Sequence, residues 1–125
     1  MSGHGELTSA ADVAKAPREW GLTVNRQQFD ALFDLRGRVA LVTGGTRGIG
    51  RSIAQGLALA RADVVVASRK AEACDETASA LRRLGGRAAG IPTHMGDLPA
   101  IARLVDQTVE QMGRLDIVVN NAATA

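Results

Sequence analysis

The sequence contains no tyrosine, and its only aromatic side chains are two phenylalanines and one tryptophan among 125 residues. Proteins that bind nucleic acid usually gather their basic residues in patches, and many place aromatic residues among them. Here thirteen of the fifteen basic residues are arginines spread along the chain, and the net charge is only +2. We therefore expect a solvated surface and no nucleic-acid partner.

Cysteine and histidine are equally scarce. The single cysteine, Cys74, excludes an internal disulfide and fits a reducing compartment, so we expect a cytoplasmic protein. Cys74 falls on the apolar side of a predicted helix, where we expect it to pack in the core. The two histidines, His4 and His94, form no cluster with metal-ligand spacing, and no metal site is predicted.

Long apolar runs are missing as well. No stretch approaches the roughly 20 residues that span a bilayer, so no membrane partner is expected. Residues 1–21 lack the apolar centre of a secretory signal. We expect residues 1–28 to form a poorly ordered N-terminal extension, with a helical turn near residues 10–16 that Pro17 ends. The apolar segment 29–35 is expected to pack against the domain that follows.

From Arg38 onward the chain contains short β-branched runs at a regular spacing. They lie at residues 39–42, 63–67, 87–91 and 116–120 and predict four strands. Each run is nearly continuous in apolar character, which is typical of parallel strands that are covered on both faces. The strands therefore predict a parallel sheet.

Three helical segments lie between the predicted strands. Residues 50–60 and 71–84 carry a helical periodicity, and a third helix is expected between Asp97 as its N-cap and Gly113 as its stop. Strands and helices in alternation favour an α/β fold class. We expect the N-terminal part of a doubly wound parallel-sheet (Rossmann) fold, with four strands and three helices, over residues 29–125.

The turn after the first strand is rich in glycine. Residues 43–50 read TGGTRGIG and lead directly into the first helix, whose free N–H groups and positive dipole end can hold a phosphate. Gly44, Gly48 and Gly50 allow an anion and the helix to approach the backbone closely. In a doubly wound sheet the ligand binds at the carboxyl ends of the strands, so the ends of the second and fourth strands should flank this turn.

Two other interpretations of the turn remain open. Residues 45–52 (GTRGIGRS) differ by one residue from a P-loop, which has lysine in place of Arg51. A planar guanidinium does not replace that compact charge. A nucleotidase also needs a magnesium-binding aspartate after a strand, whereas Asp116 precedes one. A P-loop nucleotidase and a purely structural glycine loop are the alternatives.

The sequence resembles the short-chain dehydrogenases/reductases, which carry TGxxxGxG after the first strand and NNAG after the fourth. The corresponding residues here are 43–50 and 120–123, and the resemblance covers residues 33–125. It is greatest for NADPH-dependent carbonyl reductases and 3-oxoacyl reductases. The resemblance implies a nucleotide-binding oxidoreductase that transfers hydride between a dinucleotide and a small-molecule carbonyl or alcohol substrate, as a homo-oligomer in its full-length form.

The end of the second predicted strand bears on the choice of cofactor. Enzymes of this fold that select NAD usually place an acidic residue there, to bind the ribose 2′-hydroxyl. This chain has Ser68, Arg69 and Lys70 instead, and Arg47 of the glycine turn could join them around a 2′-phosphate. We therefore expect NADP rather than NAD. The alternative interpretation is a solvated basic turn.

Several other positions match the family pattern or depart from it. The family commonly has Asp-Val after the third strand, where it contacts adenine, and this chain has His94-Met95. Asn121 resembles the residue that borders the cofactor ribose, and Asn120 resembles one that joins strand ends. Arg61 stands where the family often has a left-handed glycine, at a cost of about 1 kcal/mol. The predicted cofactor contacts are Gly44, Thr46, Arg47, Gly48, Ile49, Gly50, Ser68, Arg69, Lys70, His94, Met95, Asn121 and Ala122.

The catalytic residues of the family are not among these. Family members use a tyrosine, a lysine four positions later and a serine, all downstream of the NNAG motif. This chain has no tyrosine, and its lysines are Lys15 and Lys70, so no catalytic residue is predicted. We expect a fragment that is inactive alone, with residues 117–119 as an exposed apolar edge. A stand-alone NADP-binding module or an inactive relic is the alternative.

Overall fold

The computed structural model of the chain describes residues 24–122, which divide into two units, one up to residue 34 and one from residue 35. The first unit contains helix α2 (Arg26–Leu32). Its start is a capping box, in which Asn25 Oδ1 accepts from the Gln28 N–H at 2.8 Å and Gln28 Oε1 accepts from the Asn25 N–H at 2.9 Å. The rings of Phe29 and Phe33 meet edge to face, with centroids 5.1 Å apart.

The beginning of the described chain differs from the sequence-based expectation. Residues 26–28, expected to belong to the extension, form the first turn of α2. Of the segment 29–35, Leu35 packs against a core cluster, while Phe29 and Phe33 are exposed. The expected helical turn near residues 10–16 lies outside the described residues, and the domain boundary stays a prediction.

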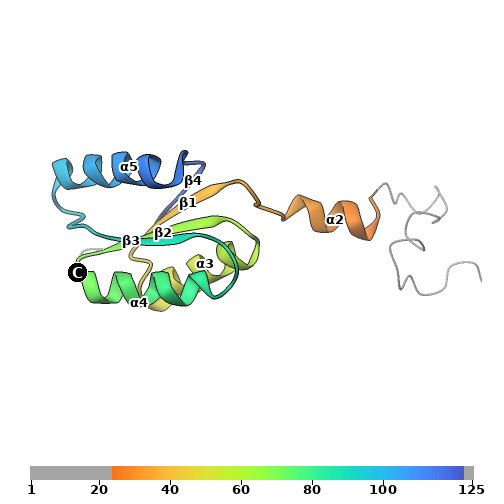
Figure 1. Cartoon of the computed structure of the whole chain (residues 1–125), viewed down its shortest axis with the longest axis horizontal. Coiled ribbons are helices and arrows are strands. Elements are labelled where there is room, and N and C mark those ends of the chain that lie inside the picture. Colours follow the sequence, from red (N-terminus) through yellow and green to blue (C-terminus); the bar gives the residue numbers. More distant parts are fainter. Residues whose placement is uncertain (1–23, 123–125) are drawn as a thin grey trace, which may run out of the picture. The chain divides into compact units, whose positions relative to one another are not determined.

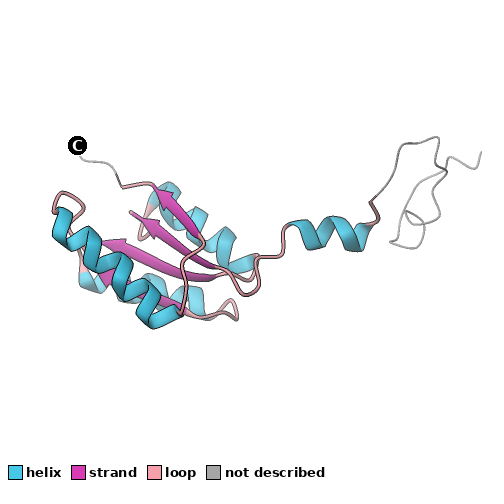
Figure 2. Ribbon diagram, turned by 90° about the horizontal axis from the view of Figure 1, so that it is seen from above, coloured by secondary structure: helices cyan, strands magenta, loops and turns pink. Residues whose placement is uncertain are grey.

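The second unit is built on one parallel sheet. Strands β1 (Val39–Thr43), β2 (Asp63–Ser68), β3 (Ala88–Pro92) and β4 (Ile117–Asn120) lie in the order β3-β2-β1-β4. Figures 1 and 2 show helices α3 (Gly48–Leu59) and α4 (Ala71–Arg82) on one face and α5 (Leu98–Met112) on the other. The expected four strands and three helices of a doubly wound α/β fold are confirmed in this unit.

The core has two layers, one on each face of the sheet. On the α3 and α4 side, Val42, Val64 and Val66 meet small helix residues such as Ala54. On the α5 side, Val39, Leu41 and Val65 belong to a second cluster, which is completed by side chains of β3 and α5. All five residues of β1 are buried, as are the four central residues of β2. Cys74 is fully buried in α4, as its helical position predicts.

Capping residues mark both ends of helix α5. Asp97 Oδ1 accepts from the Ala100 N–H at the start of α5, and Gly113 closes this helix in the left-handed conformation at φ 90°, both as predicted. Helix α3 begins at Gly48, two residues before its predicted start. Helix α4 ends at Arg82, two residues before its predicted end, although Gly85 has the left-handed φ expected of a stop.

Two local features match the sequence interpretation. Arg61 adopts φ 79°, the left-handed conformation expected at that position, although it carries a side chain. Strand β4 forms one edge of the sheet in the described chain, where Val118 is 55% exposed while Ile117 and Val119 are partly buried. Within residues 24–122, no helix is long and apolar enough to cross a membrane.

Candidate functional site

The four strands end together at the carboxyl edge of the sheet. Thr43, the last residue of β1, lies opposite Ala67 of β2 and Asn120 of β4, and Ser68 lies opposite Pro92 of β3. The glycine turn therefore leaves β1 between the ends of β2 and β4. This is the position that the strand order predicts for a ligand in a doubly wound sheet.

Thr43 joins the glycine turn to the segment after β4. Its buried hydroxyl accepts from the N–H groups of Asn121 and Ala122, each at 3.1 Å, and donates to the Val119 carbonyl at 3.3 Å. The Asn121 amide donates to the Gly44 carbonyl at 3.2 Å. The two sequence motifs are thus bound to each other directly through these neutral hydrogen bonds, which we call the Thr43 latch.

The latch refines the roles of the two asparagines. Asn120, expected to join strand ends, is exposed, and the bond that its neighbour Asn121 makes to Gly44 performs this task instead. Sequence reasoning did not assign a role to Thr43. Its position as the last, buried residue of a central strand was the signal, because a buried hydroxyl needs partners.

Three glycines of the turn have different reasons to be glycine. A Cβ on Gly50 would overlap the Gly44 carbonyl oxygen and the Asn121 amide. A Cβ on Gly44 would lie 3.2 Å from the Ala122 backbone, and Gly44 has φ 64°. Gly48 has φ 57°, but nothing lies within 4 Å of its Cβ position. The inner side of the turn is closed by packing, while the side at Gly48 is open.

The start of α3 is suited to an anion. Arg47 is the N-cap in an extended conformation, its side chain makes no capping hydrogen bond, and the first turn contains no acidic residue. The first N–H groups of such a helix have no partner within the helix. Thr46 is partly buried beside them, and Ile49 is 74% exposed. A phosphate fits this turn sterically and electrostatically.

The ends of β2 and β3 continue the same edge. Arg69 and Lys70 are exposed, and within residues 24–122 no hydrogen bond or ion pair engages the side chain of either residue or of Arg47. The Ser68 hydroxyl lies 3.3 Å from the Cys74 sulfur. Ser68 also accepts, through its carbonyl, the Thr93 N–H at 2.7 Å.

After β3 the chain turns at His94. His94 Nδ1 accepts from the Gly96 N–H at 3.0 Å, and the imidazole is exposed. The side chain of Met95 is partly buried and packs against the core cluster on the α5 side. The structure therefore brings the predicted residues of the turn and of the ends of β2, β3 and β4 to one edge.

The opposite, amino edge is held together by ion pairs. Arg87 binds Asp63 at 2.7 Å, and Arg38 and Arg114 lie 3.6 and 2.7 Å from Asp116. Hydrogen bonds from the Arg114 guanidinium, and then from the Val39 N–H, lower the pKa of the Asp116 carboxyl. This position argues against the nucleotidase alternative, because Asp116 lies far along its strand from the glycine turn.

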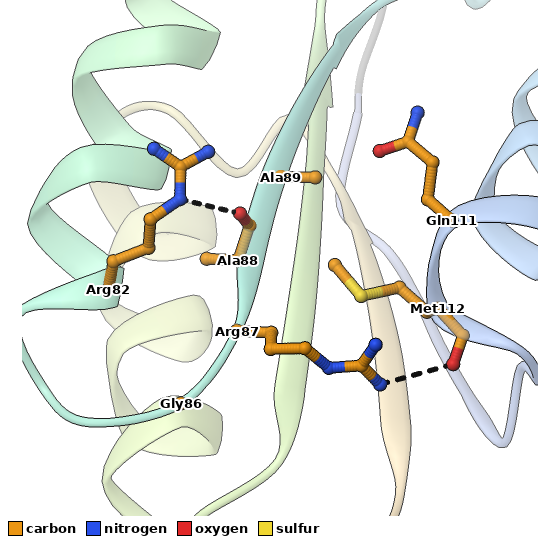
Figure 3. A pocket seen from close by; sticks show the side chains of 7 residues that line it. All are labelled: Arg82, Gly86, Arg87, Ala88, Ala89, Gln111 and Met112. Carbon is orange, nitrogen blue, oxygen red and sulfur yellow. Dashed lines mark hydrogen bonds between the residues drawn. The ribbon is translucent and has the colours of Figure 1, made fainter.

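A concavity of about 440 Å³ also lies at this amino edge, between α4, β3 and α5. Figure 3 shows that its two arginines are used for structural contacts: Arg82 Nε donates to the Ala88 carbonyl at 2.9 Å and Arg87 to the Met112 carbonyl at 3.1 Å. The concavity contains none of the predicted cofactor contacts. The two arginine hydrogen bonds instead link the region of the edge strand β3 to the flanking helices α4 and α5.

Comparisons with known sequences place these features in context. The chain is 50% identical over 93 residues to the rhamnolipids biosynthesis 3-oxoacyl-(acyl-carrier-protein) reductase of Pseudomonas aeruginosa, which covers 74% of this chain and 36% of the relative. It is 41% identical over 87 residues to tropinone reductase-like 3 of Erythroxylum coca, over 70% of this chain and 34% of the relative. The chain thus spans about a third of the length of these relatives.

Solved structures show the same fold. The chain matches a complex of RhlG with NADP from Pseudomonas aeruginosa with a TM-score of 0.69 and 48% identity, over 74% of this chain and 37% of the other. It matches the hydroxysteroid dehydrogenase of Escherichia coli with a TM-score of 0.71 and 34% identity, over 74% of this chain and 39% of the other. The short chain dehydrogenase family model matches residues 38–125. The chain therefore belongs to the short-chain dehydrogenase family.

Proposed function

We propose that residues 35–122 bind NADP(H) for an oxidoreductase that transfers hydride between this cofactor and a carbonyl or alcohol substrate. The proposal rests on the anion cradle at the carboxyl edge, by which we mean the glycine turn (residues 43–50) with the start of α3. Gly48 leaves its outer side open, and the start of α3 offers N–H groups with no acidic residue in the first turn. A pyrophosphate fits there, and the bound dinucleotide would supply or accept the hydride.

The preference for NADP over NAD is part of this proposal. Arg69 and Lys70 directly follow β2, where the ribose 2′-position is expected, Arg47 lies in the glycine turn, and no acidic residue ends β2. A charge-assisted hydrogen bond to the 2′-phosphate contributes on the order of 1.5 to 3 kcal/mol, which favours NADP by about tenfold or more. The NADP complex of the RhlG relative supports this choice.

Binding and catalysis are separate in this proposal. The 125-residue chain has no tyrosine, so the proton donor that the family resemblance implies is not among its residues. We infer that the chain binds NADPH without reducing a carbonyl substrate by itself. A stand-alone NADP-binding module, the alternative stated above, would also bind NADPH without reducing a carbonyl substrate. For the whole protein, we propose a cytoplasmic homo-oligomer that has no nucleic-acid or membrane partner.

Titration of the purified chain with NADPH and NADH, followed by nicotinamide fluorescence, tests the cofactor assignment. We expect NADPH to bind at least tenfold more tightly, and the variant Arg69→Asp to lose most of this preference. The matched control is Arg83→Asp, which makes the same charge change at the other end of α4. It should retain the preference for NADPH.

Two results would contradict the proposal. If the chain is folded by circular dichroism but does not bind NADPH at millimolar concentration, the cradle is structural. If Arg69→Asp and Arg83→Asp change the ratio of the two affinities equally, Arg69 does not bind the 2′-phosphate.

A further inference from the structure

Strand β3 is an outer strand of the sheet, because within residues 24–122 it pairs with β2 alone. Successive residues of a strand direct their backbone N–H and C=O groups to opposite sides. Just before β3, the Arg87 carbonyl accepts the Val64 N–H at 3.1 Å, and just after it the Thr93 N–H donates to the Ser68 carbonyl at 2.7 Å. The odd-numbered residues of β3 therefore face β2. The residues that direct their backbone groups away from the sheet are Ala88, Gly90 and Pro92.

Unpaired backbone groups on an outer strand are a template for another strand. On β3, two of these groups cannot serve as one. The Ala88 carbonyl accepts from Arg82 Nε of α4 at 2.9 Å (Figure 3), and Pro92 has no N–H. Within residues 24–122, no hydrogen bond outside the ladder with β2 engages the backbone of Gly90. The outer edge of β3 is thus open at its centre and closed on both sides of it.

The two closed positions are complementary in a pair of identical strands. In a solution of the pure protein, the strand that this edge meets most often is β3 of a second copy, and two copies related by a two-fold axis pair antiparallel. The overlap of β3 with itself is complete when Gly90 lies opposite Gly90, which places Ala88 opposite Pro92. Opposed residues whose backbone groups face each other exchange two hydrogen bonds. The Ala88 carbonyl of one copy would therefore need the N–H of residue 92 in the other.

We propose that Arg82 and Pro92 together close the β3 edge to a second copy of this chain. They act on the two ends of one hydrogen bond, because Pro92 removes the donor and the Arg82 guanidinium occupies the acceptor. The two-fold axis repeats this loss, so a pair of β3 strands retains bonds at its centre but not at its ends. The inference does not depend on cofactor binding, since it concerns the outer side of β3 alone.

The shared hydrogen bond predicts that the two residues are not additive. Arg82→Ala frees the acceptor while the donor is still missing, and Pro92→Val restores a donor while the acceptor is still occupied. Each single variant should change the dissociation constant of self-association by less than about threefold, whereas the double variant regains the bond twice and should associate about tenfold more tightly or more. Sedimentation velocity over a range of concentrations measures this constant for the native chain and the three variants.

The matched control combines Arg83→Ala with Pro92→Val. Arg83 follows Arg82 at the end of α4 and is exposed, and within residues 24–122 no hydrogen bond or ion pair engages its side chain. The control loses the same charge and regains the same N–H as the double variant, but it keeps the bond from Arg82 to the Ala88 carbonyl. It should therefore associate no more tightly than Pro92→Val alone.

Hydrogen exchange locates the contact between copies. The amides of Ala88 and Gly90 should exchange more slowly in the double variant as its concentration rises, and at a rate independent of concentration in the native chain. Circular dichroism shows whether the double variant is folded. If it is not, Arg82→Met takes the place of Arg82→Ala, because it keeps an apolar stem without the donor, and Arg83→Met then enters the control.

Three results would overturn the inference. If the folded double variant associates no more tightly than the native chain, or its association slows exchange at neither Ala88 nor Gly90, these residues do not close the β3 edge. If the control with Arg83→Ala associates as tightly as the double variant, Arg82 has no part in it. If the effects of the two single variants multiply to give that of the double variant, the two residues do not act on one hydrogen bond.

Discussion

At the amino edge of the sheet Asp63 and Asp116 each bind an arginine, whereas at the carboxyl edge Arg47, Arg69 and Lys70 are exposed and, among residues 24–122, unpaired. The carboxyl edge is instead closed by the neutral Thr43 latch. Charges that hold strands together are neutralised by their partners. Cations that are left exposed beside a helix start remain available for an anionic ligand.

The packing of the carboxyl edge can be broken at Gly50. Gly50→Ala should lower the free energy of unfolding by about 3 kcal/mol, because the new methyl group overlaps the Gly44 carbonyl and the Asn121 amide. Urea unfolding followed by circular dichroism measures the loss. Gly56→Ala is the control in the same helix, because a Cβ there meets nothing within 4 Å and should stabilise the chain by up to about 1 kcal/mol. Equal stabilities of the two variants would contradict the close packing.

The latch itself can be opened at Thr43. Thr43→Val keeps the shape but removes the acceptor of two N–H groups, so we expect a loss of about 2 kcal/mol. Thr43→Ser retains the hydroxyl and should lose less. Because the latch is neutral, the loss measured by urea unfolding should be the same at low and high salt. A loss that disappears in 1 M salt would show that the edge depends on charge after all.

Backbone strain sets one residue of the amino edge apart from both edges. Glycine occupies left-handed positions at the carboxyl edge (Gly44, Gly48) and at the amino edge (Gly85, Gly113), whereas Arg61, just before β2, has φ 79°. Arg61→Gly should raise the free energy of unfolding by about 1 kcal/mol relative to Arg61→Ala, which lacks the long side chain but keeps the Cβ. Thermal or urea unfolding of both variants measures the difference. If the glycine variant is the less stable one, strain at this residue is not significant.

The smallest effect is expected from the ion pairs, and it depends on pH. The pKa of Asp116 is lowered in the folded chain, first by Arg114, so its contribution to stability is present above the unfolded pKa of about 4 and is lost as the pH falls through the folded pKa. The urea midpoint should thus fall with acid more steeply in the native chain than in Asp116→Asn. Asp106→Asn, an exposed substitution on α5, should follow the native curve. If the urea midpoints of the native chain, Asp116→Asn and Asp106→Asn fall in parallel as the pH is lowered, Asp116 makes no pH-dependent contribution to stability.

The alternation of strands and helices could be predicted from the sequence because it depends on local apolar patterns. The four strands lie within one residue of their predicted bounds, and Asp97 and Gly113 end α5 as expected. The end of α4 was placed two residues too late, because apolar Leu84 extends the periodic pattern past the last helical turn. A periodic pattern fixes the face of a helix better than its end.

Contacts between distant segments were harder to predict. The glycine turn and the asparagine motif were each found from local sequence, but the latch that joins them depends on the register of β1 and β4. Helix α2 was not predicted, although Asn25 and Gln28 have the spacing of a capping box. The cofactor contacts at Arg69 and His94 stay predictions, since no single-sequence pattern fixes the position of a bound molecule.

The uneven burial of the strands has a consequence for hydrogen exchange. Strand β1 is buried along its whole length, whereas residues of β4 alternate between partly buried and exposed. The amides of β1 should exchange only through global unfolding, and those of β4 through local opening as well. One end of the latch is thus anchored in the most protected strand and the other in a less protected one. A dinucleotide that binds across the latch would slow exchange mainly in β4.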